Sequence, residues 1–265
     1  MKKIITLMLT LVLTLGAVMG LTACSNETGD LKAVKDAGKL IVGITDYAPM
    51  DYKDESGNWI GFDAELSKKF AAELGVECVF VEIVDWNNKV AEINSRQIDL
   101  IWNGMTASEE LGKQIDFSVS YAKNAQVAVV LKSSSIATKD QVKTASVAVE
   151  NGSAGQKVTV DEGFTNVNAP GNQKQALIEV KSGNSDVAII DLTMAQSLVG
   201  KGEFADLKIV DGVSYGDEIF AVGLRKGSNL KEKLDAFLYA QFENGTITTL
   251  AETYGVGINT QALTK

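Results

Sequence analysis

The feature that most constrains the fold is the alternation of two kinds of segment. Strand-like apolar runs alternate with segments whose apolar residues recur at helical spacing. Apolar residues at every fourth position from Phe62 to Leu74 mark one face of a helix. Strand-like apolar runs precede and follow this helix. In the first half, the expected strands are residues 39–45, 76–83 and 98–103, and the expected helices are residues 62–74 and 86–93. This order predicts a mostly parallel sheet with helices on both of its faces.

The same alternation begins again in the second half of the chain. The expected strands there are residues 125–131, 145–149, 186–190 and 207–210, with helices opening at 152–155 and covering 173–181. No Pro-rich linker separates the halves, so two adjoining α/β units are expected. Helices follow to the end of the chain. Asn229 and Glu232 are a candidate capping box for the first of these.

The first residues read as an export signal. A short basic start precedes residues 4–23, which carry no charge, and small residues lead up to Cys24. The sequence before Cys24 resembles a bacterial lipobox, which predicts that residues 1–23 are a lipoprotein signal peptide. Lipid would then be attached to Cys24, and residues 24–30 would form a polar tether. The alternative is a plain membrane anchor with an incidental cysteine.

Composition excludes several classes of function. The chain has no histidine, which removes Ser-His-Asp and Cys-His catalysis and His-ligated zinc or haem. Its net charge of −9 argues against nucleic acid as a partner, because phosphate contacts need clustered Lys and Arg. With Cys24 lipidated, only Cys78 remains, so no disulfide framework is expected. No motif indicates a metal or another cofactor, and none is expected.

Candidate ligand positions follow from the expected sheets. In open α/β sheets, ligands bind beyond the carboxyl ends of the strands. The residues at such ends are Tyr47, Trp86, Asn103, Thr106, Ser153 and Asp191. The segment 152–154 opens a helix and offers backbone N–H groups to an anion. Asp191 suits a ligand amine, or alternatively caps the next helix, and Trp86 suits either a ligand face or core packing.

A family resemblance rests on several short segments in a fixed order. They are Tyr47-Ala-Pro-Met-Asp-Tyr52, Gly61-Phe-Asp-Ala-Glu-Leu66, Gln97-Ile-Asp-Leu-Ile-Trp-Asn-Gly-Met-Thr106, Lys113-Gln-Ile-Asp-Phe-Ser118, Val147-Ala-Val-Glu-Asn-Gly-Ser-Ala-Gly155, residues 186–191 and Gly223-Leu-Arg-Lys226. Together, behind a lipobox, they resemble the polar amino-acid family of ABC-transporter solute-binding proteins. The resemblance covers residues 31–254.

The resemblance implies an α/β, two-lobed, periplasmic-binding-protein-like fold with two hinge-crossing strands. The crossings would fall near residues 121–127 and 215–222. Lobe 1 would then comprise residues 31–121 plus 222–265, and lobe 2 residues 122–221. Such a protein is a monomer outside the cytoplasm that captures a small polar ligand and delivers it to an ABC permease. It is a binding protein and not an enzyme, and here the lipid would hold it at the membrane.

The resemblance also implies a set of ligand contacts. Tyr47 and Trp86 would flank the ligand, and polar contacts would come from Asn103, Gly104 and Thr106. Ser153 and Ala154 would bind a carboxylate through the start of their helix. Asp191 would hold the α-ammonium group. In the alternative of an enzyme similar to cyclohexadienyl dehydratase, an acid in the same cleft would act on a dianionic substrate.

One position departs from the family pattern. The segment Met105-Thr-Ala-Ser-Glu-Glu-Leu111 places Leu111 where the family has an arginine that clamps the α-carboxylate. The chain's only arginines, Arg96 and Arg225, are not expected in the cleft, and Lys123 near the hinge is one candidate to compensate. Three alternatives stay open: an amino acid held by the helix start alone, an amine that lacks a carboxylate, or a degenerate site.

Overall fold

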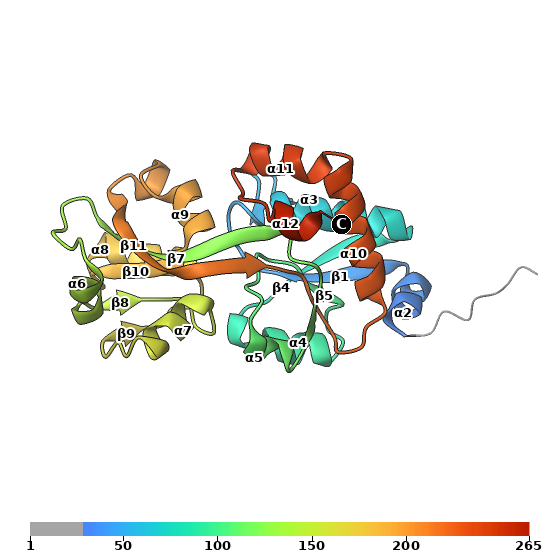
Figure 1. Ribbon diagram of the computed structural model, residues 1–265, viewed down its shortest axis with the longest axis horizontal. Coiled ribbons are helices and arrows are strands. Elements are labelled where there is room, and N and C mark those ends of the chain that lie inside the picture. The colour runs from blue at the N-terminus through green and yellow to red at the C-terminus, as the bar shows by residue number, and fades with distance from the viewer. Residues whose placement is uncertain (1–28, 265) are drawn as a thin grey trace, which may run out of the picture.

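The computed structural model describes residues 29–264. The predicted signal peptide and the lipidated Cys24 lie outside the described residues. Within residues 29–264, no helix combines the length and the apolar character that a membrane span requires. The chain forms a two-lobed α/β fold with one mixed sheet in each lobe, and the lobes lie side by side along the long axis of the molecule (Figure 1).

The first lobe is built on a sheet with the strand order β4-β1-β5-β12-β6. Its strands are β1 (Lys39–Ile44), β4 (Glu77–Glu82), β5 (Leu100–Ile101), β6 (Asp116–Phe117) and β12 (Gly223–Leu224). β1 pairs in parallel with β4 and β5, whereas β12 is antiparallel to β5 and β6. The remaining elements are α2 (Asp30–Ala37), β2 (Tyr52–Lys53), β3 (Trp59–Ile60), α3 (Phe62–Leu74), η1 (Trp86–Asn88), α4 (Lys89–Asn94), α5 (Glu109–Gly112), α10 (Leu230–Glu243), α11 (Thr246–Tyr254) and α12 (Thr260–Leu263).

The second lobe is built on a sheet with the strand order β11-β7-β10-β8-β9. Its strands are β7 (Ala122–Leu131), β8 (Val147–Ala148), β9 (Val167–Asn168), β10 (Val187–Asp191) and β11 (Leu207–Phe220). Its helices are α6 (Lys139–Thr144), α7 (Ala154–Asp161), α8 (Gln173–Ser182), α9 (Leu192–Leu198) and η2 (Gly202–Phe204). Both sheets therefore combine parallel strands with antiparallel neighbours.

The chain passes between the lobes along β7 and β11. These strands pair in antiparallel fashion and run from the second sheet toward the first lobe (Figure 1). The sequence predicts only a short strand at 207–210, but β11 extends to Phe220 with register shifts near Ser214. Many of its later residues are exposed or half-buried. An apolar run therefore does not mark this part of the strand in the sequence.

Helix α3 shows why the predicted elements form. Its apolar face, with Phe62, Leu66 and Phe70, is fully buried against the first sheet. Phe70 packs on Trp102 and Phe237 at centroid distances of 6.3 and 5.2 Å. The C-terminal helices thus complete the core of the lobe in which the chain begins.

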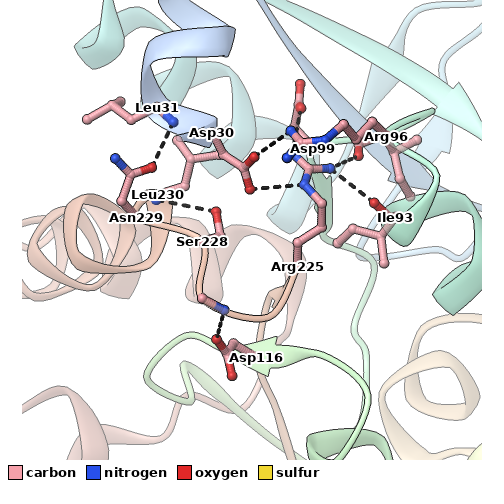
Figure 2. Close-up of polar contacts among 12 residues, drawn as sticks. Asp30, Leu31, Ile93, Arg96, Asp99, Asp116, Arg225, Ser228, Asn229 and Leu230 are labelled. Carbon is pink, nitrogen blue, oxygen red and sulfur yellow. Dashed lines mark hydrogen bonds and ion pairs between the residues drawn. The ribbon is translucent and has the colours of Figure 1, made fainter. Parts of the chain in front are cut away.

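The N-terminal helix is fixed to the first lobe by an ion-pair cluster (Figure 2). Asp30, expected at the end of the tether, is instead the buried first residue of α2. Its carboxylate contacts Arg225 Nε at 2.9 Å and Arg96 Nη1 at 2.7 Å. Both arginines therefore lie in this cluster, which the sequence did not predict.

The predicted capping box at Asn229 is wrong. Asn229 occupies the N-cap position of α10, but its side chain makes no capping hydrogen bond there. Its Oδ1 instead accepts the backbone N–H of Leu31 at 2.9 Å, as Figure 2 shows. The amide oxygen therefore contributes to the attachment of α2.

Candidate functional site

A cavity of about 700 Å³ lies between the two lobes. This volume suits a small-molecule ligand. All nine predicted ligand-contact residues line it: Tyr47, Trp86, Asn103, Gly104, Thr106, Leu111, Ser153, Ala154 and Asp191. Both lobes and the crossing strand β11 contribute to its wall. Residues 29–264 contain no group of three or more His, Cys, Asp or Glu side chains arranged to hold a metal ion.

Asp191 ends strand β10 and is almost completely buried, with 4% of its surface exposed. Its carboxylate accepts hydrogen bonds from the side-chain amides of Asn124, Gln126 and Gln173, the second at 2.6 Å. Asp191 also stands at the N-cap of α9, but its side chain makes no capping hydrogen bond. Three amide donors therefore hold the carboxylate in place at the cavity wall.

Glu218, on the crossing strand β11, is a second carboxylate beside Asp191. Its Oε2 accepts from Asn124 and Gln126 at 2.9 and 3.0 Å, so the two carboxylates share donors. It also accepts from the Thr106 hydroxyl at 3.1 Å. Burial raises the pKa of Asp191 to about 6, and the charge of Glu218 acts in the same direction. A ligand cation at this point would relieve the repulsion.

The charge of the cavity lining is predominantly negative. The acidic lining residues are Glu110, Glu150, Asp161, Asp191, Asp217 and Glu218, and the basic ones are Lys89 and Lys157. Burial raises the pKa of Glu150 to about 8 and lowers the pKa of Lys89 to about 8. A wall with this excess of carboxylates favours a ligand that carries a positive group.

Three aromatic residues of the described part of the chain line the cavity: Tyr47, Trp86 and Tyr215. Tyr47 and Trp86 are 4% and 7% exposed, and each also packs into a hydrophobic core of the first lobe. Trp86 therefore both lines the cavity and packs into the core. The Tyr47 hydroxyl is buried next to the Asp191 carboxylate. Burial and then the nearby charge of Asp191 raise the pKa of this hydroxyl well above its ordinary value.

Existing hydrogen bonds fix the segment after β5. The Asn103 amide group accepts from the Thr45 backbone at 2.8 Å and donates to the Thr45 hydroxyl at 2.7 Å. The Gly104 N–H donates to the buried carboxylate of Asp63 at 2.6 Å. The Asn103 side chain thus positions the loop that lines the cavity.

The start of α7 presents free backbone donors to the cavity. Ser153 is the N-cap residue, and its hydroxyl accepts the Gln156 N–H at 3.1 Å. The N–H groups of Ala154 and Gly155 have no hydrogen-bond partner within the described part of the chain. Free N–H groups at the positive end of a helix dipole attract an anion.

The lobes touch on the side of the cavity where α7 begins. The Lys89 ammonium of the first lobe donates to the Gly152 carbonyl of the second at 3.0 Å. The Asn151 amide donates to Asp85 at 3.3 Å. A Cβ atom on Gly152 would lie 2.8 Å from the Asn87 Cα, which is closer than atoms approach without displacement. The described arrangement is therefore a closed one on this side.

The structure corrects the expectation for a compensating lysine. Lys123 is exposed on β7, opposite Ile219 of β11, and does not line the cavity. Side chains alternate across a strand, so Lys123 lies on the face of β7 opposite to that of Asn124, whose amide contacts Asp191. Leu111 does line the cavity, in α5. No arginine of residues 29–264 lines it with Leu111.

Comparison with known proteins decides the family. Residues 40–257 match the family model described as bacterial extracellular solute-binding proteins, family 3. The chain is 30% identical to the arginine-binding extracellular protein ArtP of Bacillus subtilis, over 97% of this chain and 99% of ArtP. The L-cystine-binding protein TcyJ of Escherichia coli is 29% identical over 91% of this chain and 92% of its own. A variant of ArgBP from T. maritima has a TM-score of 0.80 at 30% identity, covering 85% of this chain and 98% of ArgBP.

The chain belongs to family 3 of the bacterial extracellular solute-binding proteins. The predicted family and the two-lobed periplasmic-binding-protein fold are confirmed. Its relatives are binding proteins, so this family 3 protein is a binding protein and not an enzyme. The alternative of a dehydratase-like enzyme is not supported.

Several lining and supporting residues of this family 3 protein were missed in the sequence. Glu218 and Lys89 carry no local motif, and the chain brings them to the cavity only through folding. Asn124 and Gln126 did carry a signal, because two amides at a period of two interrupt an apolar strand. That spacing places both amides on the face of β7 that meets Asp191.

Proposed function

We propose that this solute-binding protein captures an amino acid in its interlobe cavity. The carboxylate of Asp191 carries the proposal, because it is buried, held by three amides and beside a second carboxylate. A buried charge of this kind is costly unless a partner neutralises it. The α-ammonium group of an amino acid supplies that partner.

The other cavity residues fit the same ligand. Tyr47 and Trp86 provide apolar faces beside Asp191, and aromatic faces also attract cations. The Tyr47 hydroxyl next to Asp191 provides a further polar contact. In the same lobe as Asp191, the free N–H groups at the start of α7 suit the α-carboxylate. An amino acid would thus contact both lobes at once.

Delivery to an ABC permease is part of the proposal. The relatives are extracellular or periplasmic binding proteins. Ligand contacts to both lobes would favour the closed form, with bending at residues 121–127 and 215–222. Lobe 1 (31–121 plus 222–265) and lobe 2 (122–221) would move as units. Lipid on Cys24 would keep this monomer close to its permease.

A second candidate is an amine that lacks a carboxylate. Two observations favour it: the excess of carboxylates around the cavity, and Leu111 in the place of the family's arginine. In this case Asp191 and Glu218 would hold the amine without any partner at α7. The two candidates differ only in the group that the ligand presents to the α7 side.

A thermal-shift panel on residues 25–265 tests the proposal. The panel holds the twenty L-amino acids, L-cystine, polyamines and choline-like cations. Ligand at a hundred times its Kd stabilises by about 2.7 kcal/mol. At about 2–4 °C per kcal/mol, Tm should rise by about 5–10 °C with one class of amino acid. A rise with amines alone would establish the second candidate, and no rise with any compound would contradict both.

A further inference from the structure

Only two cationic side chains of the described residues line the cavity, and their environments differ. Lys157 is 54% exposed at its side chain and is paired with Asp161 at 2.8 Å. Lys89 is only 5% exposed and forms no ion pair with a described carboxylate. A buried ammonium without a carboxylate partner is costly in the same way as a buried carboxylate. Lys89 is therefore the cation in this cavity that still needs an anion.

The Lys89 ammonium lies beside the start of α7. It donates to the carbonyls of Trp86 at 3.1 Å and Gly152 at 3.0 Å. Gly152 stands two residues before Ala154, whose N–H is free. An ammonium group has three donors, so one remains after these two bonds. An anion at the α7 start would therefore meet both backbone N–H groups and a full positive charge.

We propose that Lys89 binds the carboxylate of the amino-acid ligand together with the start of α7. Lys89 thereby supplies the positive charge for the ligand carboxylate that an arginine at position 111 supplies in the family pattern, where this chain has Leu111. This inference rests on the proposed function, since it needs a ligand with a carboxylate. Lys89 in the first lobe then binds the carboxylate of the amino acid, and Asp191 in the second lobe binds its ammonium group.

The neighbouring acids leave the charge of Lys89 available. Glu150 and Asp85 are the carboxylates that act on Lys89. Burial raises the pKa of Glu150 to about 8, so Glu150 is mostly protonated at neutral pH. Asp85 is occupied by the Asn151 amide and the Asn87 N–H. Neither neighbour replaces a ligand carboxylate held directly at the ammonium.

Lys89 also bridges the lobes, and a purely structural bridge is the competing explanation. Loss of a bridge would weaken every ligand by the same factor. Loss of a carboxylate contact would weaken only ligands that have a carboxylate. Comparing an amino acid with its decarboxylated amine therefore separates the two roles.

The experiment uses calorimetric titration of wild-type protein, Lys89→Met and the control Lys32→Met, which changes an exposed lysine that is paired with Asp36 and does not line the cavity. The probes are the L-amino acids and, for each one that binds, its decarboxylated amine, for example agmatine for L-arginine. Lys89→Met should weaken amino-acid binding by about 10- to 100-fold. Binding of the amine should change by less than about threefold. Lys32→Met should leave both affinities near the wild-type values.

A rescue variant distinguishes the loss of a carboxylate contact from a general disturbance of the fold. Leu111→Arg in the Lys89→Met background should restore amino-acid affinity, because position 111 lines the same cavity. Equal losses for amino acid and amine, or no loss for either, would overturn the role of Lys89 and leave the proposed function standing. If wild-type protein binds no amino acid, the proposed function fails and the Lys89 assignment fails with it.

Discussion

At the residue scale, ionisable groups are buried where the ligand is expected to bind. Burial raises the pKa values of Asp191 and Glu150 to about 6 and about 8, and lowers that of Lys89 to about 8. Each of these shifts means that burial disfavours the charged form of the group. Such clusters are typical of functional sites. A bound ligand of opposite charge offsets the free-energy cost of burying these groups in the ligand-free protein.

The first prediction concerns pH and the ligand-free protein. The folded state binds the Glu150 proton up to about pH 8, whereas the unfolded chain releases it near 4.5. Between these values the folded state holds more protons, so the free energy of unfolding falls as pH rises. The slope is up to about 1.4 kcal/mol per pH unit for one such proton. Asp191 acts in the same direction up to about pH 6.

The measurement is the urea-unfolding free energy of ligand-free protein between pH 5 and pH 8, which we expect to decrease. Glu150→Gln removes the proton and keeps the shape, so this variant should show a shallower decrease. Glu203→Gln is the control, because Glu203 is exposed. An unchanged slope in Glu150→Gln would show that Glu150 is not protonated in the folded state.

The second prediction concerns the position of the Tyr47 ring next to Gly104. A Cβ atom on Gly104 would lie 2.6 Å from Tyr47 Cε1, so Gly104→Ala should displace the ring and weaken ligand binding. Gly104 also has φ +56°, and alanine there costs about 1–2 kcal/mol. Gly75→Ala is the matched control, with φ +75° and nothing within 4 Å. Titration should show reduced affinity for Gly104→Ala alone, and equal affinities would refute the role of the ring.

At the scale of elements, short contacts between α7 and η1 determine how closely the lobes meet. Gly152 precedes α7 and approaches Asn87 of η1 so closely that no side chain fits between them. The hydrogen bonds from Lys89 and Asn151 lie on the same side. Closure of the cavity therefore depends on a glycine in this position.

The third prediction follows from this approach. Gly152→Ala should prevent full closure and weaken ligand binding, whereas Gly163→Ala should not. Gly152 and Gly163 have φ +73° and +70°, so both variants carry similar backbone strain, but Gly163 has nothing within 4 Å. Titration and melting together measure the two effects. Wild-type affinity in Gly152→Ala would mean that the ligand does not need the lobes to meet here.

The fourth prediction concerns the attachment of α2. Although burial raises it, hydrogen bonds from Arg225, Ser228 and Arg96 hold the pKa of Asp30 below its usual value. Arg225→Met leaves that carboxylate buried without its main partner, at a cost of about 3–5 kcal/mol. Lys226→Met, which breaks a half-exposed pair with Asp116, should cost about 1 kcal/mol or less. Urea unfolding measures both losses, and equal losses in the two variants would contradict the importance of the cluster. Neither variant should change ligand affinity.

At the scale of the whole molecule, much of the fold was predictable because local patterns reflect burial. Most strands and helices of both lobes follow apolar periodicity. The six candidate residues at the expected strand ends all line one cavity. Glu218 and Lys89 were not predictable, since no local pattern marks a polar residue that folding places at a distant site. Lys123 was misplaced because the sequence shows its nearness to the hinge but not which face of β7 it occupies.

Asp191 lines the cavity and pairs with Gln126 of β7, one of the two strands that cross between the lobes. Asn124, which holds its carboxylate, lies on the crossing strand β7, and Glu218 lies on β11. A ligand ammonium at Asp191 would thus act where the lobes are joined. It would shift the population of closed molecules only as far as it binds that form better than the open one.

The most direct test is calorimetric titration of Asp191→Asn with the amino acid that gives the largest thermal shift. Asp161→Asn is the control, because Asp161 also lines the cavity but is exposed and paired with Lys157. Asp191→Asn should bind about 100-fold more weakly or worse, because the ligand ammonium loses a buried charged partner. Asp161→Asn should bind as wild type does. Wild-type affinity in Asp191→Asn would contradict the account of the site.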